Sequence, residues 1–299
     1  MRKFLAVMLV VMVGCFFVGC KDKTPAEKGA EALKKVEVPD APDKVVLEAA
    51  AALKEGNLIK IYAMLPDSYQ KDVQTILGTV TAKMDKEIYE KVFALLPKLI
   101  EVVKKDENLA KQTGPFMPLV EEFVKLLETS KLNTYEGFKG LDVAGFLAEH
   151  GKAYNDFGWK VAMLMDKEEA EGTKKMLDTV KAEVKGEIKD DAATVLVTIG
   201  DDSDEMAFVK VEGKWIPKDL ADDWAKGKEK AAKNAEEAMA KFDESKDQIK
   251  AQLKGVEDAL AKGDAGMLTG MAGMLMGGGM GGPPPARDPE PAPEPAPEK

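Results

Sequence analysis

The feature that most constrains this fold is a change in hydrophobic periodicity along the chain. Over residues 43–178, apolar side chains recur every three or four positions, which indicates a series of amphipathic helices. Over residues 179–217, apolar and polar residues alternate, as at Val195 and Val197, and this indicates three or four short antiparallel strands. The helical spacing returns over residues 219–262. We therefore predict an α+β fold that is mainly helical, with a small antiparallel sheet followed by a long C-terminal helix.

Local signals divide the predicted α+β domain, residues 42–218, into elements. Its first helix should end at Gly56, since glycine is the usual residue after a helix C-terminus. Residues 85–105 carry a strong apolar stripe and should form another helix, whereas residues 131–141 are expected to form a loop. The pair Glu212-Gly213 suits a tight hairpin turn between the last two strands, because Gly supplies the positive φ that such turns need.

The predicted long helix, residues 219–262, carries a narrow apolar stripe among many lysines and glutamates. The stripe consists of Ala235, Ala238, Phe242, Ile249, Leu253, Val256 and Leu260. Spacings of three and four over several turns fit either a coiled coil or a long helix packed on the domain. Because Ser245 and Gln252 fall inside the stripe, the sequence leaves both arrangements open.

The composition excludes several classes of function. The 299 residues include 43 Lys+Arg and 53 Asp+Glu, for a formal net charge of −10, and Arg2 and Arg287 are the two arginines. Because acidic residues outnumber basic ones and arginine is almost absent, we expect no basic face that could neutralise phosphates, and therefore no nucleic-acid partner. Two Cys and one His cannot supply a Cys/His zinc cluster or most nucleophilic triads. We therefore expect neither catalysis nor a cofactor.

The N-terminus has the organisation of a secretory signal. A basic start at Arg2 and Lys3 precedes an apolar run over residues 4–18, and Lys21 ends that run. The run is shorter than an ordinary membrane-spanning helix, which needs about 20 apolar residues. This combination predicts export from the cytoplasm.

The end of the apolar run, Phe17-Val18-Gly19-Cys20, resembles the lipobox of bacterial lipoproteins, although Leu is usual where Phe17 stands. The resemblance implies that the Cys20 thiol receives a diacylglycerol, that cleavage follows between Gly19 and Cys20, and that the new amino terminus is acylated. Met12-Val13-Gly14-Cys15 is a weaker copy, because cleavage there would leave an apolar stretch on the mature chain. An ordinary cleaved signal and an uncleaved anchor are the alternatives.

Segments without a clear apolar stripe flank the predicted domain. Residues 1–19 would be the signal peptide, and residues 20–41, polar with scattered Ala, are expected to form a tether between lipid and domain. Residues 263–299, Gly/Met-rich and then Pro/Glu-rich from residue 283, are predicted to be a disordered tail. In enterobacterial lipoproteins an Asp directly after the Cys favours retention in the inner membrane. Because Asp22 stands one place later, we expect a periplasm-facing protein in the outer rather than the inner membrane.

Two short motifs in the predicted domain resemble the nuclear-transport-factor-2-like fold of small envelope lipoproteins. These are Ala-Ala-Ala-Leu-Lys-Glu-Gly-Asn at residues 50–57 and Phe-Val-Lys-Val-Glu-Gly-Lys-Trp-Ile at residues 208–216. The resemblance implies a curved sheet wrapped around helices as a cone, often with a pocket. The stretch between Tyr69 and Asp178 would then be a large helical insertion. The fold family carries no fixed chemistry.

Aromatic and sulfur-containing residues supply the candidate binding sites. Trp215 and Phe208 should lie in the core, with the lining of a ligand pocket as the alternative, which also extends to Trp159 and Trp224. Five methionines form a weak candidate for Cu(I) binding, because thioethers are soft ligands. These are Met267, Met271, Met274, Met276 and Met280. The alternative is an apolar segment that docks on the protein or the membrane, and we expect no metal site.

Two polar features are expected to be structural. His150 should lie near a helix end, where a partly charged imidazole favours the helix dipole. An acidic cluster at Asp201, Asp202, Asp204 and Glu205 should be a solvated hairpin turn, because it lacks the glycine and distant glutamate of a calcium loop.

The sequence thus predicts a lipid-anchored envelope protein that acts by binding or scaffolding. Its expected partners are the membrane, through the N-terminal lipid, and another envelope protein. The alternative is a pocketed module that binds a small apolar ligand or, less favoured, hydrolyses one.

Overall fold

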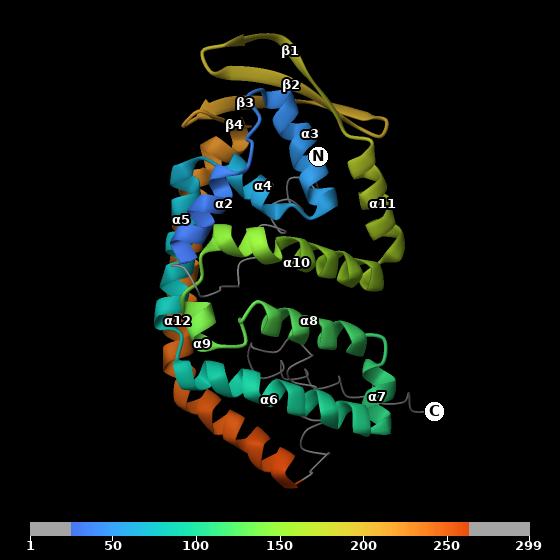
Figure 1. Ribbon diagram of the computed structural model, residues 1–299, viewed down its shortest axis with the longest axis vertical. Coiled ribbons are helices and arrows are strands. Elements are labelled where there is room, and N and C mark those ends of the chain that lie inside the picture. The colour runs from blue at the N-terminus through green and yellow to red at the C-terminus, as the bar shows by residue number, and fades with distance from the viewer. Residues whose placement is uncertain (1–24, 263–299) are drawn as a thin grey trace, which may run out of the picture.

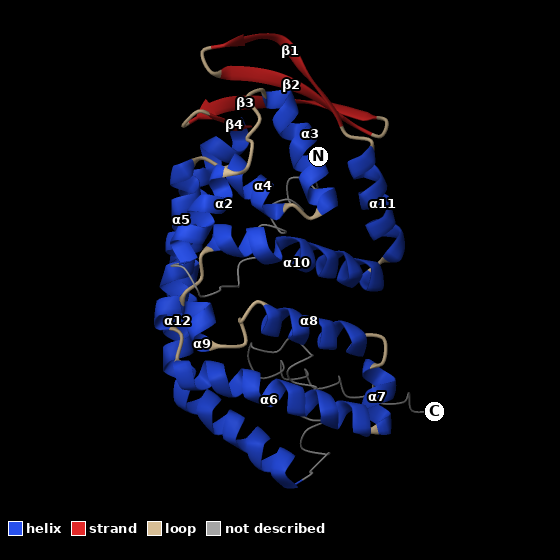
Figure 2. Ribbon diagram, in the orientation of Figure 1, coloured by secondary structure: helices blue, strands red, loops and turns tan. Residues whose placement is uncertain are grey.

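A computed structural model describes residues 25–262 as helices α2–α12 and a four-stranded sheet (Figures 1 and 2). The helices before the sheet are α2 (Pro25–Lys34), α3 (Pro42–Glu55), α4 (Leu58–Met64), α5 (Asp67–Lys83), α6 (Lys86–Lys105), α7 (Glu107–Thr113), α8 (Met117–Thr129), α9 (Tyr135–Lys139), α10 (Val143–Met165) and α11 (Lys167–Asp178). The strands β1 (Lys181–Lys189), β2 (Ala192–Ile199), β3 (Asp202–Val211) and β4 (Lys214–Pro217) follow, and α12 (Lys218–Lys262) comes last. This order confirms the predicted α+β, mainly helical class.

The sheet is an antiparallel meander in the order β1-β2-β3-β4. Its first turn, at Asp190 and Asp191, and its last, at Glu212 and Gly213, both place two consecutive residues at positive φ, as a tight two-residue hairpin requires. The hairpin predicted at Glu212-Gly213 is therefore present. The sheet lies at one end of the elongated molecule, with α3 packed beneath it (Figure 1).

Apolar burial is divided between two main clusters. The larger one joins the helices, with Leu53, Tyr62 and Phe138 among its buried members. The second lies between α3 and the sheet and contains Phe208 and Trp215. Gly56 ends α3 with φ of 75°, and its N–H bonds the carbonyl of Ala52, as the sequence predicted for this helix end.

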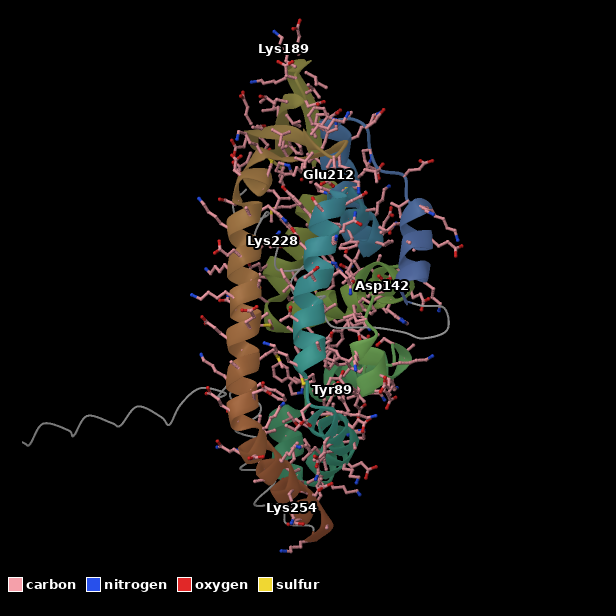
Figure 3. The ribbon with its side chains drawn as sticks, turned by 90° about the vertical axis from the view of Figure 1, so that its left-hand side faces the viewer. Tyr89, Asp142, Lys189, Glu212, Lys228 and Lys254 are labelled. Carbon is pink, nitrogen blue, oxygen red and sulfur yellow. The ribbon has the colours of Figure 1, made fainter. Side chains whose placement is uncertain are left out.

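Helix α12 packs along the length of the molecule. Its 45 residues extend about 67 Å at 1.5 Å per residue, from β3 and β4 past α5 to α6 (Figure 3). Near its start Trp224 stacks on Tyr69 of α5, with ring centroids 4.0 Å apart, and Lys228 bonds Asp72 of α5 at 3.1 Å. Near its end Val256 packs on Leu95 of α6. Of the two arrangements that the sequence left open, the described residues adopt the long helix packed on the domain.

The prediction of a tether over residues 20–41 is wrong for its described part, which contains α2. The Ala, Glu and Lys of this segment are strong helix formers, and polar composition alone does not distinguish a tether from a surface helix. Helix α2 packs on α10, and a Cβ at Gly29 would overlap the Asp142 carboxylate, so glycine permits the close approach. Lys28 also pairs with Glu149 at 3.4 Å.

Two smaller predictions also need correction. The expected loop over residues 131–141 contains α9, which Thr134 caps by accepting a hydrogen bond from the N–H of Gly137 at 3.1 Å. His150 lies inside α10 rather than at a helix end, because α10 continues to Met165. The predicted signal peptide and the predicted tail both fall outside residues 25–262. Among the described helices, none combines the length and apolar character needed to cross a membrane.

Candidate binding groove

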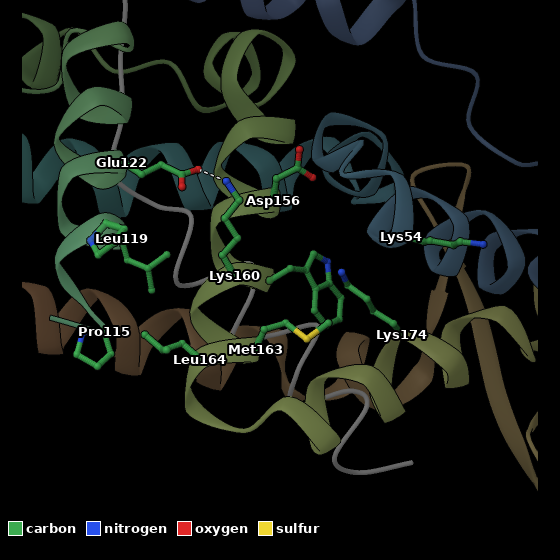
Figure 4. Close-up of a pocket in the computed structure, with 11 residues that line it drawn as sticks. Lys54, Pro115, Leu119, Glu122, Asp156, Lys160, Met163, Leu164 and Lys174 are labelled. Atoms are coloured by element: carbon green, nitrogen blue, oxygen red, sulfur yellow. Dashed lines mark hydrogen bonds and ion pairs between the residues drawn. The ribbon is translucent and has the colours of Figure 1, made fainter.

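An open depression of about 740 Å³ lies where α8, α10 and α11 meet the end of α3 (Figure 4). We call it the groove. Its lining residues are Lys54, Pro115, Pro118, Leu119, Glu122, Asp156, Trp159, Lys160, Met163, Leu164 and Lys174. A volume of this size lies within the range of about 300–1,000 Å³ that is usual for ligand sites.

Helix α10 supplies one wall of the groove because of its residue spacing. Trp159 and Lys160 follow Asp156 by three and four positions and precede Met163 by four and three, so all four share one helix face. Asp142 begins α10 as its N-cap, since its side chain accepts a hydrogen bond from the N–H of Gly145 at 2.7 Å. The groove wall thus belongs to a long helix whose first half is anchored in the larger core.

The opposite wall is the start of α8. Pro115 lies in the turn that precedes the helix, and Pro118 stands in its first turn, where a missing N–H costs no intrahelical bond. Leu119 and Glu122 follow on the same face. Phe123, in the next position, stacks on Phe157 of α10 with ring centroids 5.5 Å apart, which joins the two walls.

Most charges of the groove are already paired. The Lys160 ammonium lies 2.6 Å from a carboxylate oxygen of Glu122 (Figure 4). The Asp156 carboxylate accepts a hydrogen bond from Lys152 at 2.7 Å. Lys54 at the end of α3 pairs with Asp178, and this hydrogen bond raises the pKa of Lys54. These pairs stabilise the rim and leave little charge for an ionic ligand to neutralise.

Lys174 of α11 differs from the other groove lysines. Its ammonium lies 5.0 Å from the centroid of the Trp159 ring, a cation–π distance. Within residues 25–262, no carboxylate lies within ion-pair distance of Lys174. The indole and this ammonium together offer an apolar surface with one positive charge at its side.

Exposed apolar residues occur at, or next in sequence to, positions that line the groove. Phe116 is 48% exposed, Leu164 is 38% exposed and Met165 at the end of α10 is 78% exposed. Single exposed apolar residues are common, but these lie in or next to groove-lining positions in the sequence. Such clusters mark interaction surfaces.

The structure places the predicted aromatic candidates in different environments. Trp215 and Phe208 are 3% and 2% exposed within the sheet core, and the Trp215 indole N–H donates to the carbonyl of Asp40 at 3.0 Å. They are core residues and do not line the groove. Trp224 of α12 donates to Asp72 of α5 at 3.0 Å and does not line the groove, so Trp159 is the one tryptophan of the three that does.

The remaining candidates are structural or outside the described residues. His150 is half-buried against Phe146, and burial lowers the pKa of its imidazole. Burial likewise raises the pKa of Asp142, while the hydrogen bond from Gly145 acts in the opposite direction. Of the exposed acidic cluster, Asp201 lies in the β2–β3 turn as predicted, whereas Asp202, Asp204 and Glu205 lie in β3, because the strand pairing extends to Asp202. No group of His, Cys, Asp and Glu in residues 25–262 is arranged to hold a metal. Gly19, Cys20 and the five methionines from Met267 to Met280 lie outside this range.

Sequence reasoning named Trp159 among the tryptophans that could line a pocket, but it did not predict the groove around this residue, although one signal was available. Trp159 and Met163 stand one turn apart and flank Lys160, so a large apolar pair shares a face with a charged residue. This pattern is typical of a helix face that is half-exposed rather than buried.

No protein-family model matches the chain, and no curated protein or solved structure matches it either.

Proposed function

We propose that this chain is a lipid-anchored protein of the bacterial cell envelope that acts by binding a partner through the groove. The basic start, the apolar run and the Phe17–Cys20 pattern support export and lipid attachment at Cys20. The position of Asp22 supports the outer membrane as its location. The anchored body would then face the periplasm and act by binding or scaffolding, without catalysis.

The observation that carries the binding role is the exposed apolar lining of the groove beside Lys174. Enclosed pockets bury most of a small ligand, whereas this depression is open along one side and Leu164 remains 38% exposed. An open trough between two helices fits an extended or helical segment of a protein, which buries one face against it. We therefore favour an envelope protein as the occupant.

A second candidate, an enclosed small apolar ligand, is favoured by the volume of the groove alone. Native mass spectrometry of the purified chain distinguishes the two functions. A bound mass that is lost in a Trp159→Ala variant would support the small ligand. A ligand-free chain that still captures a protein would support the first proposal.

The test of the protein partner is photo-crosslinking in living cells from a photoreactive residue at Leu164. A matched control carries the same residue at Ile188 of β1, which is 48% exposed and far from the groove. We expect adducts with another protein from position 164 that disappear on Lys174→Glu. Adducts of equal yield from both positions would contradict the proposal. So would the absence of adducts from position 164 when nothing else occupies the groove.

A further inference from the structure

We infer that residues 263–282 of the same chain occupy the groove in the free protein, so that a partner must displace them. This segment, which we call the Met segment, follows the last described residue of α12 directly. The inference rests on the proposed function, because it assumes that the groove binds an apolar polypeptide. It adds an occupant and a mode of regulation to that site.

The first argument is reach. Leu260, near the end of α12, packs in the cluster that contains Leu99 and Val102 of α6. From there α6 ends at Lys105, and α7, about 10 Å long, leads to the turn with Pro115 at the groove. Fully extended, the first five residues of the Met segment would cover about 17 Å, which exceeds the length of α7, and the whole segment would cover about 66 Å. The segment therefore starts beside the C-terminal half of α6, and its length exceeds the path along α7 to Pro115.

The second argument is the chemistry of the lining. Six of the groove residues are apolar, while Lys54, Lys160, Glu122 and Asp156 already have charged partners. Such a lining accepts an occupant of low charge, because a charged one would need to break these pairs. The Met segment carries Asp264 as its single charge.

The third argument is shape. The Met segment has seven large apolar residues separated by Gly, Ala and Thr, namely Met267, Leu268, Met271, Met274, Leu275, Met276 and Met280. Unbranched Met side chains adapt to irregular apolar surfaces and form favourable sulfur–aromatic contacts, here available at Trp159. Intervening glycines let the backbone approach the walls closely. By contrast, residues 283–299 alternate Pro with acidic residues and have no large apolar side chain, so they fit this lining less well.

Tethering makes even weak docking effective. A segment joined to its site by a short linker acts at an effective concentration in the millimolar range. A partner in solution must therefore bind more tightly than the Met segment would as a free peptide. Removing the anchoring methionines should strengthen partner binding, since the competing segment is weakened.

The direct experiment uses the full mature chain with Cys20→Ser and a photoreactive residue at Leu164. We expect a crosslink within one chain to residues 263–282, located by peptide mass spectrometry. The crosslink should be lost when all five methionines of the segment are replaced by Ser, and it should be missing from the Ile188 control. A crosslink to residues 283–299, a crosslink between two chains, or no crosslink would each overturn the inference.

A second measurement reports on the groove without a bulky probe. In a chain labelled with 5-fluorotryptophan, the Trp159→Phe variant assigns the Trp159 resonance. The five-Ser variant should shift this resonance and leave those of Trp215 and Trp224 unchanged, because both lie away from the groove. An unchanged Trp159 resonance would count against docking of the Met segment.

The outcomes separate this inference from the proposed function. If position 164 crosslinks to another protein but never to residues 263–282, the groove binds a partner and the Met segment is not its occupant. If the Met segment docks but the five-Ser variant captures no partner in the envelope, the segment is the permanent filling of the groove. The proposed partner binding then fails, while the intramolecular contact stands.

Discussion

Replacing Trp215 with Ala should remove a large fraction of the stability of the domain. The ring is 3% exposed and packs in the core between α3 and the sheet, next to Phe208. Truncating a buried Trp to Ala costs about 3–5 kcal/mol, from lost transfer free energy and the cavity left behind. The hydrogen bond from the indole to the carbonyl of Asp40 is also lost, but Asp40 is exposed, so water can replace the donor at little further cost.

The free energy of unfolding should be measured by urea denaturation followed by far-UV circular dichroism, because the substitution removes a fluorophore. Domains of this kind have a total stability of about 5–15 kcal/mol, so the expected loss is easily resolved. Trp215→Phe serves as the control, since it retains much of the apolar volume and should cost less than the Ala variant. A loss below about 1 kcal/mol for Trp215→Ala would refute the burial argument. It would also revive the prediction that Trp215 contacts a ligand.

Three other predictions test separate features. Burial lowers the pKa of His150 from its ordinary 6.5, so below that pH the unfolded chain binds a proton more readily than the native state does. The native chain should therefore lose stability relative to His150→Gln as the pH falls below 6.5. Equal pH profiles of the two chains in thermal unfolding would contradict this. Cys20→Ala should leave an unprocessed precursor without lipid, whereas Cys15→Ala should be processed normally; mass spectrometry of the mature amino terminus decides, and an acylated Cys15 would reverse the assignment. Deleting residues 283–299 should leave the melting temperature unchanged, because the segment has no large apolar side chain to bury; a lower melting temperature would mean that it packs on the domain.

The sequence predicted those parts of the fold whose signals are local. The change of period located the sheet within two residues of its observed ends, since alternation is a property of neighbouring residues. The helix end at Gly56 and the hairpin turn at Glu212-Gly213 were predicted correctly, because glycine is the residue that adopts a positive φ most readily. Helix α2 was missed because its polar residues fit a tether as well as a surface helix, and only packing against α10 distinguishes the two.

The groove could not be predicted from local signals. Its lining comes from α3, the start of α8, the second half of α10 and α11, so positions from Lys54 to Lys174 meet only in the folded chain. Within α10 the clearest apolar stripe consists of Val143, Phe146 and Leu147, which belong to the core. Trp159 lies beyond this stripe, and its exposure depends on what α8 and α11 leave uncovered.

If Cys20 carries a lipid, the packing of α2 on α10 would set how far the body can move from the membrane. If Cys20 carries the lipid, the connection to Pro25 consists of residues 21–24, which cover only about 14 Å when fully extended. A tether over the whole of residues 20–41 would have allowed excursions several times longer. With so short a connecting segment, the body would stay close to the bilayer and diffuse laterally along its surface. Partners on the same membrane would then meet the body far more often than partners that diffuse freely in the periplasm. The close contact at Gly29 would limit the connection in this way, because it allows α2 to pack on α10.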